Sequence, residues 1–198
     1  MILDGWGIAT NKDVSAIDKA NTPFVDSLYT KYPHNTLEAS GLAVGLPEGQ
    51  MGNSEVGHMN IGAGRVVYQD LVRINNEVKD GSIARNEAFL AAVQYAKSKN
   101  KAIHLIGLVS DGGVHSHIDH LNGLLTALHE QACDKVFVHA FTDGRDTDPK
   151  SGLGFIKTVE THMKKTTGKL ASICGRYYAM DRDKRWQRIK LAYNAMVI

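Results

Sequence analysis

Three short apolar runs, separated from one another by stretches of helical pattern, limit the folds that are open to this sequence. The runs cover residues 102–109, 135–141 and 169–174, and helices are expected between them, up to about residue 131 and over 153–165. Nearly continuous apolar runs of this length suit strands of a parallel sheet that is covered on both faces. Strands that alternate with helices imply right-handed crossovers. The sequence therefore predicts an α/β fold built on a parallel sheet.

Further elements are expected before the first of these strands. A cap followed by proline at Thr22-Pro23 predicts a helix to about residue 32, and the alternation over 36–40 is typical of a half-buried strand. An apolar stripe predicts a helix over 66–80. Asn86 can cap another helix that ends at about residue 99.

The composition argues against a general affinity for nucleic acid or acidic membranes. Lys and Arg number 23 against 21 Asp and Glu, a net charge of +2, so any anion site must be local. The basic stretch 176–190 is interrupted by Asp181 and Asp183 and is typical of a solvated helix face. Cys133 and Cys174 match no metal-site spacing and are expected to be reduced packing residues. With no long apolar run and no leader pattern, we expect a cytoplasmic protein.

A glycine-rich stretch over residues 45–65 surrounds a single hydroxyl, that of Ser54. Glycine allows left-handed backbone angles and a close approach of the backbone to a ligand. Asn53 or Ser54 can cap a helix here, with Glu55 in its first turn. A serine at a helix amino terminus lies beside unpaired N–H groups that attract phosphate. The stretch is therefore either a phosphate-handling loop or a flexible surface loop with a capping serine.

Three polar loops are expected at the carboxyl edge of the sheet, where ligands bind in parallel α/β folds. They cover residues 110–117, 142–149 and 175–183. In the second loop, Arg145 and Asp146 form either a solvated turn or a pair in which the guanidinium holds a carboxylate and the aspartate transfers protons.

The histidines of the first loop leave three readings open. Within residues 115–120, His117 and His120 would lie three apart on a helix with Asp119 near them and could bind zinc, although the spacing matches no common zinc signature. The histidines could instead form a solvated helix start, or His115 could contact a substrate. His117 and His120 stay unassigned.

Some stretches of the sequence have an unusual wording when they are taken together. They are Leu3-Asp4-Gly5-Trp6-Gly7, residues 45–65, Val109-Ser110-Asp111-Gly112-Gly113-Val114-His115-Ser116-His117, Thr142-Asp143-Gly144-Arg145-Asp146 and Gly175-Arg176-Tyr177-Tyr178-Ala179-Met180-Asp181-Arg182-Asp183. Together they resemble one family, the 2,3-bisphosphoglycerate-independent phosphoglycerate mutases, which are relatives of alkaline phosphatase with an unrelated second domain inserted. The resemblance extends over all 198 residues.

The resemblance implies an isomerase of glycolysis that interconverts 3-phosphoglycerate and 2-phosphoglycerate. It implies that Ser54 is the nucleophile and carries the phosphoryl group, and that Asp4 and Ser54 are ligands to divalent metal. The metal is usually manganese, with magnesium possible, and the complete enzyme holds two ions. Metal coordination would supply the deprotonation that a serine hydroxyl needs at neutral pH.

The resemblance also implies a substrate pocket. His115, Arg145, Arg176 and Arg182 would hold the glycerate, with Arg145 on its carboxylate. Asp146 would bind substrate as well and pass protons to and from the 2- and 3-hydroxyls. The partners are then small phosphoglycerates rather than nucleic acid or membrane, and a monomer is expected.

The same resemblance divides the chain. Residues 1–75 would belong to the phosphatase-like domain that holds metal and nucleophile, and residues 76–198 to the inserted substrate-binding, or transferase, domain. The family's remaining metal ligands, arginines and lysine come from a carboxyl-terminal half that this sequence does not contain. We therefore expect an amino-terminal fragment that has no mutase activity by itself.

Two other classes of function stay open. A metal-dependent phosphohydrolase of the alkaline phosphatase superfamily would need Asp4 and Ser54 but not Arg176. A non-catalytic module that binds small anions would need only the residues from about 80 onward.

Overall fold

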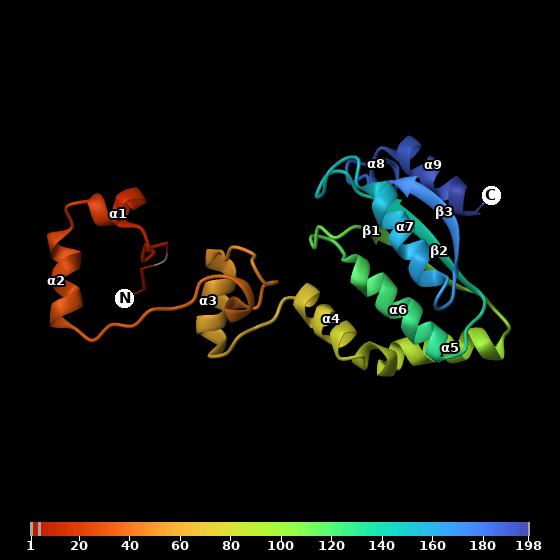
Figure 1. Ribbon diagram of the computed structural model, residues 1–198, viewed down its shortest axis with the longest axis horizontal. Coiled ribbons are helices and arrows are strands. Elements are labelled where there is room, and N and C mark those ends of the chain that lie inside the picture. Colours follow the sequence, from red (N-terminus) through yellow and green to blue (C-terminus); the bar gives the residue numbers. More distant parts are fainter. Residues whose placement is uncertain (1, 4, 198) are drawn as a thin grey trace. The chain divides into compact units, whose positions relative to one another are not determined.

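The chain forms two compact units, residues 1–68 and 69–198, in a computed structural model that describes residues 2–3 and 5–197 (Figure 1). Each unit is described by itself. The first contains η1 (Lys12–Val14), α1 (Ala16–Lys19), α2 (Pro23–Lys31), η2 (Gly41–Val44) and α3 (Ser54–Ala63). The second contains α4 (Asp70–Lys79), η3 (Ser82–Arg85), α5 (Glu87–Ser98), β1 (Ile103–Val109), α6 (Ile118–Glu130), β2 (Val136–Thr142), α7 (Gly152–Met163), β3 (Lys169–Gly175), α8 (Arg176–Ala179) and α9 (Trp186–Val197).

The second unit confirms the α/β fold. Its three strands pair in parallel in the order β1-β2-β3, with Ile103 opposite Val136 and Val138 opposite Leu170. A register shift follows Val138 on β2. The helices α6 and α7 lie between successive strands, as the alternating pattern predicts.

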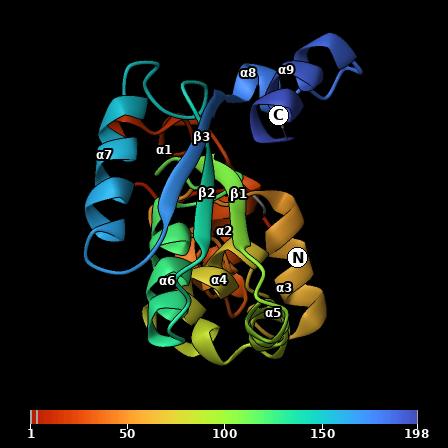
Figure 2. The same ribbon diagram turned by 90° about the vertical axis from the view of Figure 1, so that its right-hand side faces the viewer.

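The core of this unit lies between the sheet and α5, α6 and α7 (Figure 2). Its fully buried members include Leu125 and Leu128 on α6, Val138 on β2 and Val159 on α7. Coverage of both sheet faces, which the apolar strands predict, is not found among the described residues: Ile106 on β1 is 58% exposed. The apolar strands would also suit a sheet with helices on both faces, but the helices that connect the strands pack on one face only of the sheet in the part of the chain that the structure describes.

The helix α4 belongs to this second unit. His120 on α6 contacts the side chain of Asn75, and a Cβ added at Gly123 would lie 2.8 Å from Val78 Cγ1, so the two helices pack closely. The boundary expected between residues 75 and 76 falls inside α4. The assignment of the two parts to a phosphatase-like and a substrate-binding domain stays a prediction.

The first unit has a small core of its own, formed by Val44, Leu46 and Val56. The side chain of Asn60 joins two parts of the chain here, because it donates to the Val44 carbonyl at 3.0 Å and accepts the Val67 N–H at 2.8 Å. The strand predicted over residues 36–40 is wrong: these residues are irregular, and no strand occurs in the described part of this unit. Without a neighbouring strand the backbone groups have no ladder to join.

No helix among the described residues is both long and apolar enough to cross a lipid bilayer.

Candidate functional site

The glycine-rich stretch places Ser54 at the first residue of α3. Asn53 is the cap, and its side chain accepts the Val56 N–H at 3.1 Å, which resolves the choice between Asn53 and Ser54. Gly52 lets the loop pass the preceding segment, because an added Cβ would lie only 1.6 Å from the Ala39 carbonyl oxygen. Ser54 is exposed, so its hydroxyl is open to a ligand at the positive end of the helix.

His58 lies one turn after Ser54 on the same helix face, a contact that the sequence analysis did not single out. Its Nδ1 is 3.0 Å from Ser54 Oγ and 2.8 Å from the Ser54 carbonyl oxygen. With a proton on Nδ1 the ring donates to the carbonyl, and without one it accepts the serine hydroxyl. The sequence could have indicated this contact, because residues four apart on a helix lie on the same face.

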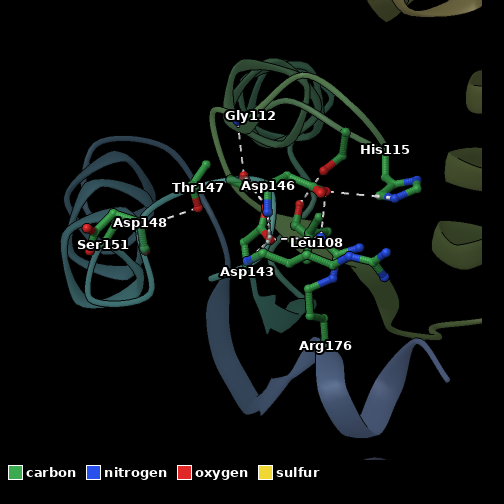
Figure 3. Close-up of polar contacts among 12 residues, drawn as sticks. Leu108, Gly112, His115, Asp143, Asp146, Thr147, Asp148, Ser151 and Arg176 are labelled. Carbon is green, nitrogen blue, oxygen red and sulfur yellow. Dashed lines mark hydrogen bonds and ion pairs between the residues drawn. The ribbon is translucent and has the colours of Figure 1, made fainter.

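In the second unit, residues that follow the three strands meet at the carboxyl edge of the sheet (Figure 3). Ser110 follows β1, Asp143 follows β2 and Arg176 follows β3. Ser110 Oγ donates to Asp143 Oδ2 at 2.7 Å, and Arg176 Nη1 donates to Asp143 Oδ1 at 2.8 Å. A single carboxylate therefore connects all three strand ends.

Two further predicted site residues join this group. Arg176 Nη1 also donates to Asp146 Oδ2 at 2.5 Å, and His115 Nε2 lies 3.8 Å from the same oxygen. Asp146 is mostly buried, with 16% of its side chain exposed, whereas 38% of His115 is exposed. The structure thus brings His115, Asp146 and Arg176 together around one carboxylate oxygen, with the imidazole on the more open side (Figure 3).

Two other predicted residues of the second unit are exposed. Arg145 is in the same turn as Asp146, with its backbone N–H bound to Asp143 and its side chain exposed. Arg182 is exposed in the loop between α8 and α9. Ser54 belongs to the first unit, and Asp4 lies outside the described residues.

Both histidines that the sequence left unassigned have structural contacts. His117 is the N-cap of α6 and accepts the Asp119 N–H, and His120 Nε2 contacts Asn75 Oδ1 at 2.5 Å. Within residues 2–3 and 5–197, no three His, Cys, Asp or Glu side chains are grouped as a metal ion would require. These contacts favour the helix-start interpretation of His117 over the zinc interpretation.

The contacts within the cluster keep Asp143 and Arg176 charged. Burial alone would raise the pKa of the Asp143 carboxyl, but the hydrogen bonds that it accepts outweigh burial and hold this pKa well below its usual 3.8. Burial likewise opposes the charge on Arg176, while its bonds to Asp146 and Asp143 raise the pKa of the guanidinium. The cluster is therefore an ionised network at neutral pH.

This network should make stability depend on acidity. A carboxylate with a depressed pKa stabilises the fold fully above pH 3.8, its value when unperturbed, and loses that contribution as the pH falls further. We expect Asp143→Asn to lower the free energy of unfolding by about 1–3 kcal/mol at neutral pH and to flatten the loss below pH 4. Urea unfolding of the 198-residue chain from pH 7 to pH 3 measures both.

The matched control for this experiment is Asp134→Asn, at an exposed position before β2. It should follow the pH curve of the unaltered chain. If Asp143→Asn also follows that curve, the ionised network does not stabilise the fold.

Ser110 and Asp143 were not identified as site residues from the sequence. The signal was their position, since each directly follows a strand of the parallel sheet. Ser110 is 1% exposed as a residue, and the Asp143 side chain is 1% exposed. Both contact other protein groups rather than solvent.

The comparisons with known proteins agree with one another. Residues 74–198 match the family model described as the BPG-independent PGAM N-terminus. Proteins named 2,3-bisphosphoglycerate-independent phosphoglycerate mutase from Flavobacterium johnsoniae and Clostridium perfringens (strain SM101) are 60% and 59% identical over 197 and 199 residues. Each match covers 100% of this chain and 39% of the relative, so the chain spans about two fifths of the length of these proteins.

A solved structure resembles the chain as well. It is described as "Crystal structures of Leishmania mexicana phosphoglycerate mutase at low cobalt concentration", with 34% identity and a TM-score of 0.67. The match covers 90% of this chain and 34% of that one.

Proposed function

The chain belongs to the family of the 2,3-bisphosphoglycerate-independent phosphoglycerate mutases, and from that membership we propose that it takes part in the interconversion of 3-phosphoglycerate and 2-phosphoglycerate through a phosphoserine at Ser54. The observation that carries the proposal is the meeting of His115, Asp146 and Arg176 around one carboxylate oxygen. A hydrolase would need no such cluster, because water would complete its reaction.

The proposed first step takes place at Ser54. Its exposed hydroxyl attacks the phosphoryl group of the substrate, and the N–H groups at the start of α3 favour the negative charge there. Glycerate is left with a free hydroxyl. Return of the phosphoryl group to the neighbouring hydroxyl gives the isomer.

The residues of the second unit would hold glycerate between the two transfers. Arg145 binds the carboxylate through its planar guanidinium, and His115, Arg176 and Arg182 complete the pocket. Asp146 takes the proton from the hydroxyl that is about to attack and returns one to the hydroxyl that leaves. Asp146 Oδ2 lies 3.8 Å from His115 Nε2 and both side chains are partly exposed, which supports a shared contact with one small ligand.

We propose a divalent cation, manganese or else magnesium, with Asp4 and Ser54 among its ligands. Among the described residues Ser54 supplies one hard oxygen donor that fits such an ion, and Asp4 lies outside them. When bound, the ion favours the deprotonated hydroxyl. The cobalt in the description of the Leishmania mexicana structure is compatible with a divalent-metal requirement. A monomeric state and a cytoplasmic location stay predictions.

A chimera tests this function. Residues 1–198 replace the matching segment of the Flavobacterium johnsoniae relative, to which they are 60% identical. We expect the chimera with Mn²⁺ to convert 3-phosphoglycerate to 2-phosphoglycerate without added 2,3-bisphosphoglycerate, and the isolated chain to show no turnover. A folded chimera that only releases inorganic phosphate would contradict the proposal and favour a phosphohydrolase, and turnover by the isolated chain would contradict its predicted dependence on further residues.

A further inference from the structure

A single buried carboxylate receives four hydrogen bonds at the carboxyl edge of the sheet. Asp143 Oδ2 accepts from Ser110 Oγ, and Oδ1 accepts from Arg176 Nη1 and from two backbone N–H groups, those of Arg145 and Asp146, at 3.0 Å each. With 1% of its side chain exposed, Asp143 has no surface left for a ligand. Its role must therefore be exerted through its neighbours.

We propose that Asp143 is the positioning residue of the substrate pocket, holding Arg176 and the turn that carries Arg145 and Asp146 in the geometry that glycerate binding needs. The inference rests on the proposed function. Among the residues of this network, Asp143 alone contacts every strand end.

The guanidinium of Arg176 is held by two carboxylates, those of Asp143 and Asp146. Its Nη1 is shared between Asp143 and Asp146, and its side chain is 11% exposed. If Asp146 gains a proton or turns to a substrate hydroxyl, its attraction for Arg176 weakens. Asp143 then still holds the guanidinium, because its buried carboxylate accepts from Arg176 Nη1 directly.

The turn that carries Arg145 and Asp146 also depends on the Asp143 carboxylate. The backbone N–H groups of Arg145 and Asp146 both point to Asp143 Oδ1, in the manner of an Asx turn, and this fixes where the two side chains leave the backbone. Ser110 holds the Asp143 carboxylate in place. Its hydroxyl accepts the Gly112 N–H at 3.0 Å and donates to Asp143 Oδ2. Ser110 is thus a support for Asp143.

The test is a double-mutant cycle in the chimera. Asp143→Asn keeps the shape of the side chain and removes its charge, and we expect kcat/KM for 3-phosphoglycerate to fall by about 10- to 100-fold, because a small displacement of positioned groups costs this much. In an Arg176→Ala background the same change should cost at least about threefold less than in the unaltered chimera, because only its effect through the turn that carries Arg145 and Asp146 remains. Ser110→Ala should lower kcat/KM by a smaller factor and add little to Asp143→Asn.

A purely structural role would give a different result. The two changes would then multiply, and this outcome overturns the proposal, as does a kcat/KM of Asp143→Asn within twofold of the unaltered chimera. Asp134→Asn is the matched control and should leave both kcat and KM unchanged.

Hydrogen exchange separates this inference from the proposed function. In the 198-residue chain, the amides of Arg145 and Asp146 should exchange at least about tenfold faster after Asp143→Asn, because they lose a charged acceptor. If the unaltered chimera has no isomerase activity, the proposed function fails and exchange alone decides the positioning role. Unchanged exchange overturns it.

Discussion

Replacing Ser54 with alanine in the chimera is expected to abolish isomerisation, with a fall in kcat of about 10⁴-fold or more, as is typical when a covalent nucleophile is removed. The reason is chemical, because alanine offers no oxygen to receive the phosphoryl group. The fold should not suffer: Asn53, not Ser54, caps α3, and alanine favours a helix. A coupled assay that detects 2-phosphoglycerate measures the effect.

A serine elsewhere in the first unit provides the control. Ser27 is half-buried on α2, where its hydroxyl donates to the Phe24 carbonyl at 2.8 Å and accepts from Lys31 Nζ at 3.5 Å. Ser27→Ala should retain the activity of the unaltered chimera. If Ser54→Ala retains a tenth or more of that activity, Ser54 is not the nucleophile.

The second large effect is expected for Asp146→Asn, which should lower kcat by about 10²- to 10⁴-fold and change KM far less. Asparagine has the same shape and can still accept a hydrogen bond from Arg176, so the pocket keeps its form. It cannot exchange protons with the substrate hydroxyls. Steady-state kinetics with 3-phosphoglycerate separate the two parameters.

The control for this change lies in the same loop. Asp148 is exposed and accepts the Lys150 N–H at 2.7 Å, so Asp148→Asn is the same chemical change at a position that should not transfer protons. Its kcat should stay within about twofold of the unaltered chimera. A large rise in KM with an unchanged kcat for Asp146→Asn would assign this residue to binding alone.

Much of the second unit could be predicted from the sequence because its strands are continuous apolar runs. The predicted run 169–174 corresponds to β3 (Lys169–Gly175), and the predicted helix 153–165 corresponds to α7 (Gly152–Met163). Elements that precede the first strand were harder to predict. The helix expected from residue 66 begins only at Asp70, since the Val67 N–H bonds to the Asn60 side chain instead of entering a helix. An apolar stripe does not reveal such a competing contact.

The candidate site was predictable to the extent that its residues carry unusual chemistry at strand ends. The family resemblance assigned His115, Asp146 and Arg176 to a substrate pocket, all three fall in the loops expected at the strand ends, and they lie together in the structure. Asp143 was not identified, because an aspartate before glycine is typical of an ordinary turn. That it is buried, and that it faces Ser110 from a neighbouring strand, are consequences of packing that a linear sequence does not display.

The most direct test of the central claim is to find where the phosphoryl group rests. The chimera would be mixed with 3-phosphoglycerate, quenched within milliseconds, and its peptides examined for phosphate by mass spectrometry under both acidic and alkaline conditions, so that phosphoserine and phosphohistidine are each preserved. We predict phosphate on Ser54 and none in the Ser54→Ala variant. Phosphate on His58, whose Nδ1 lies 3.0 Å from the serine hydroxyl, or isomerisation without any phosphorylated peptide, would contradict the account.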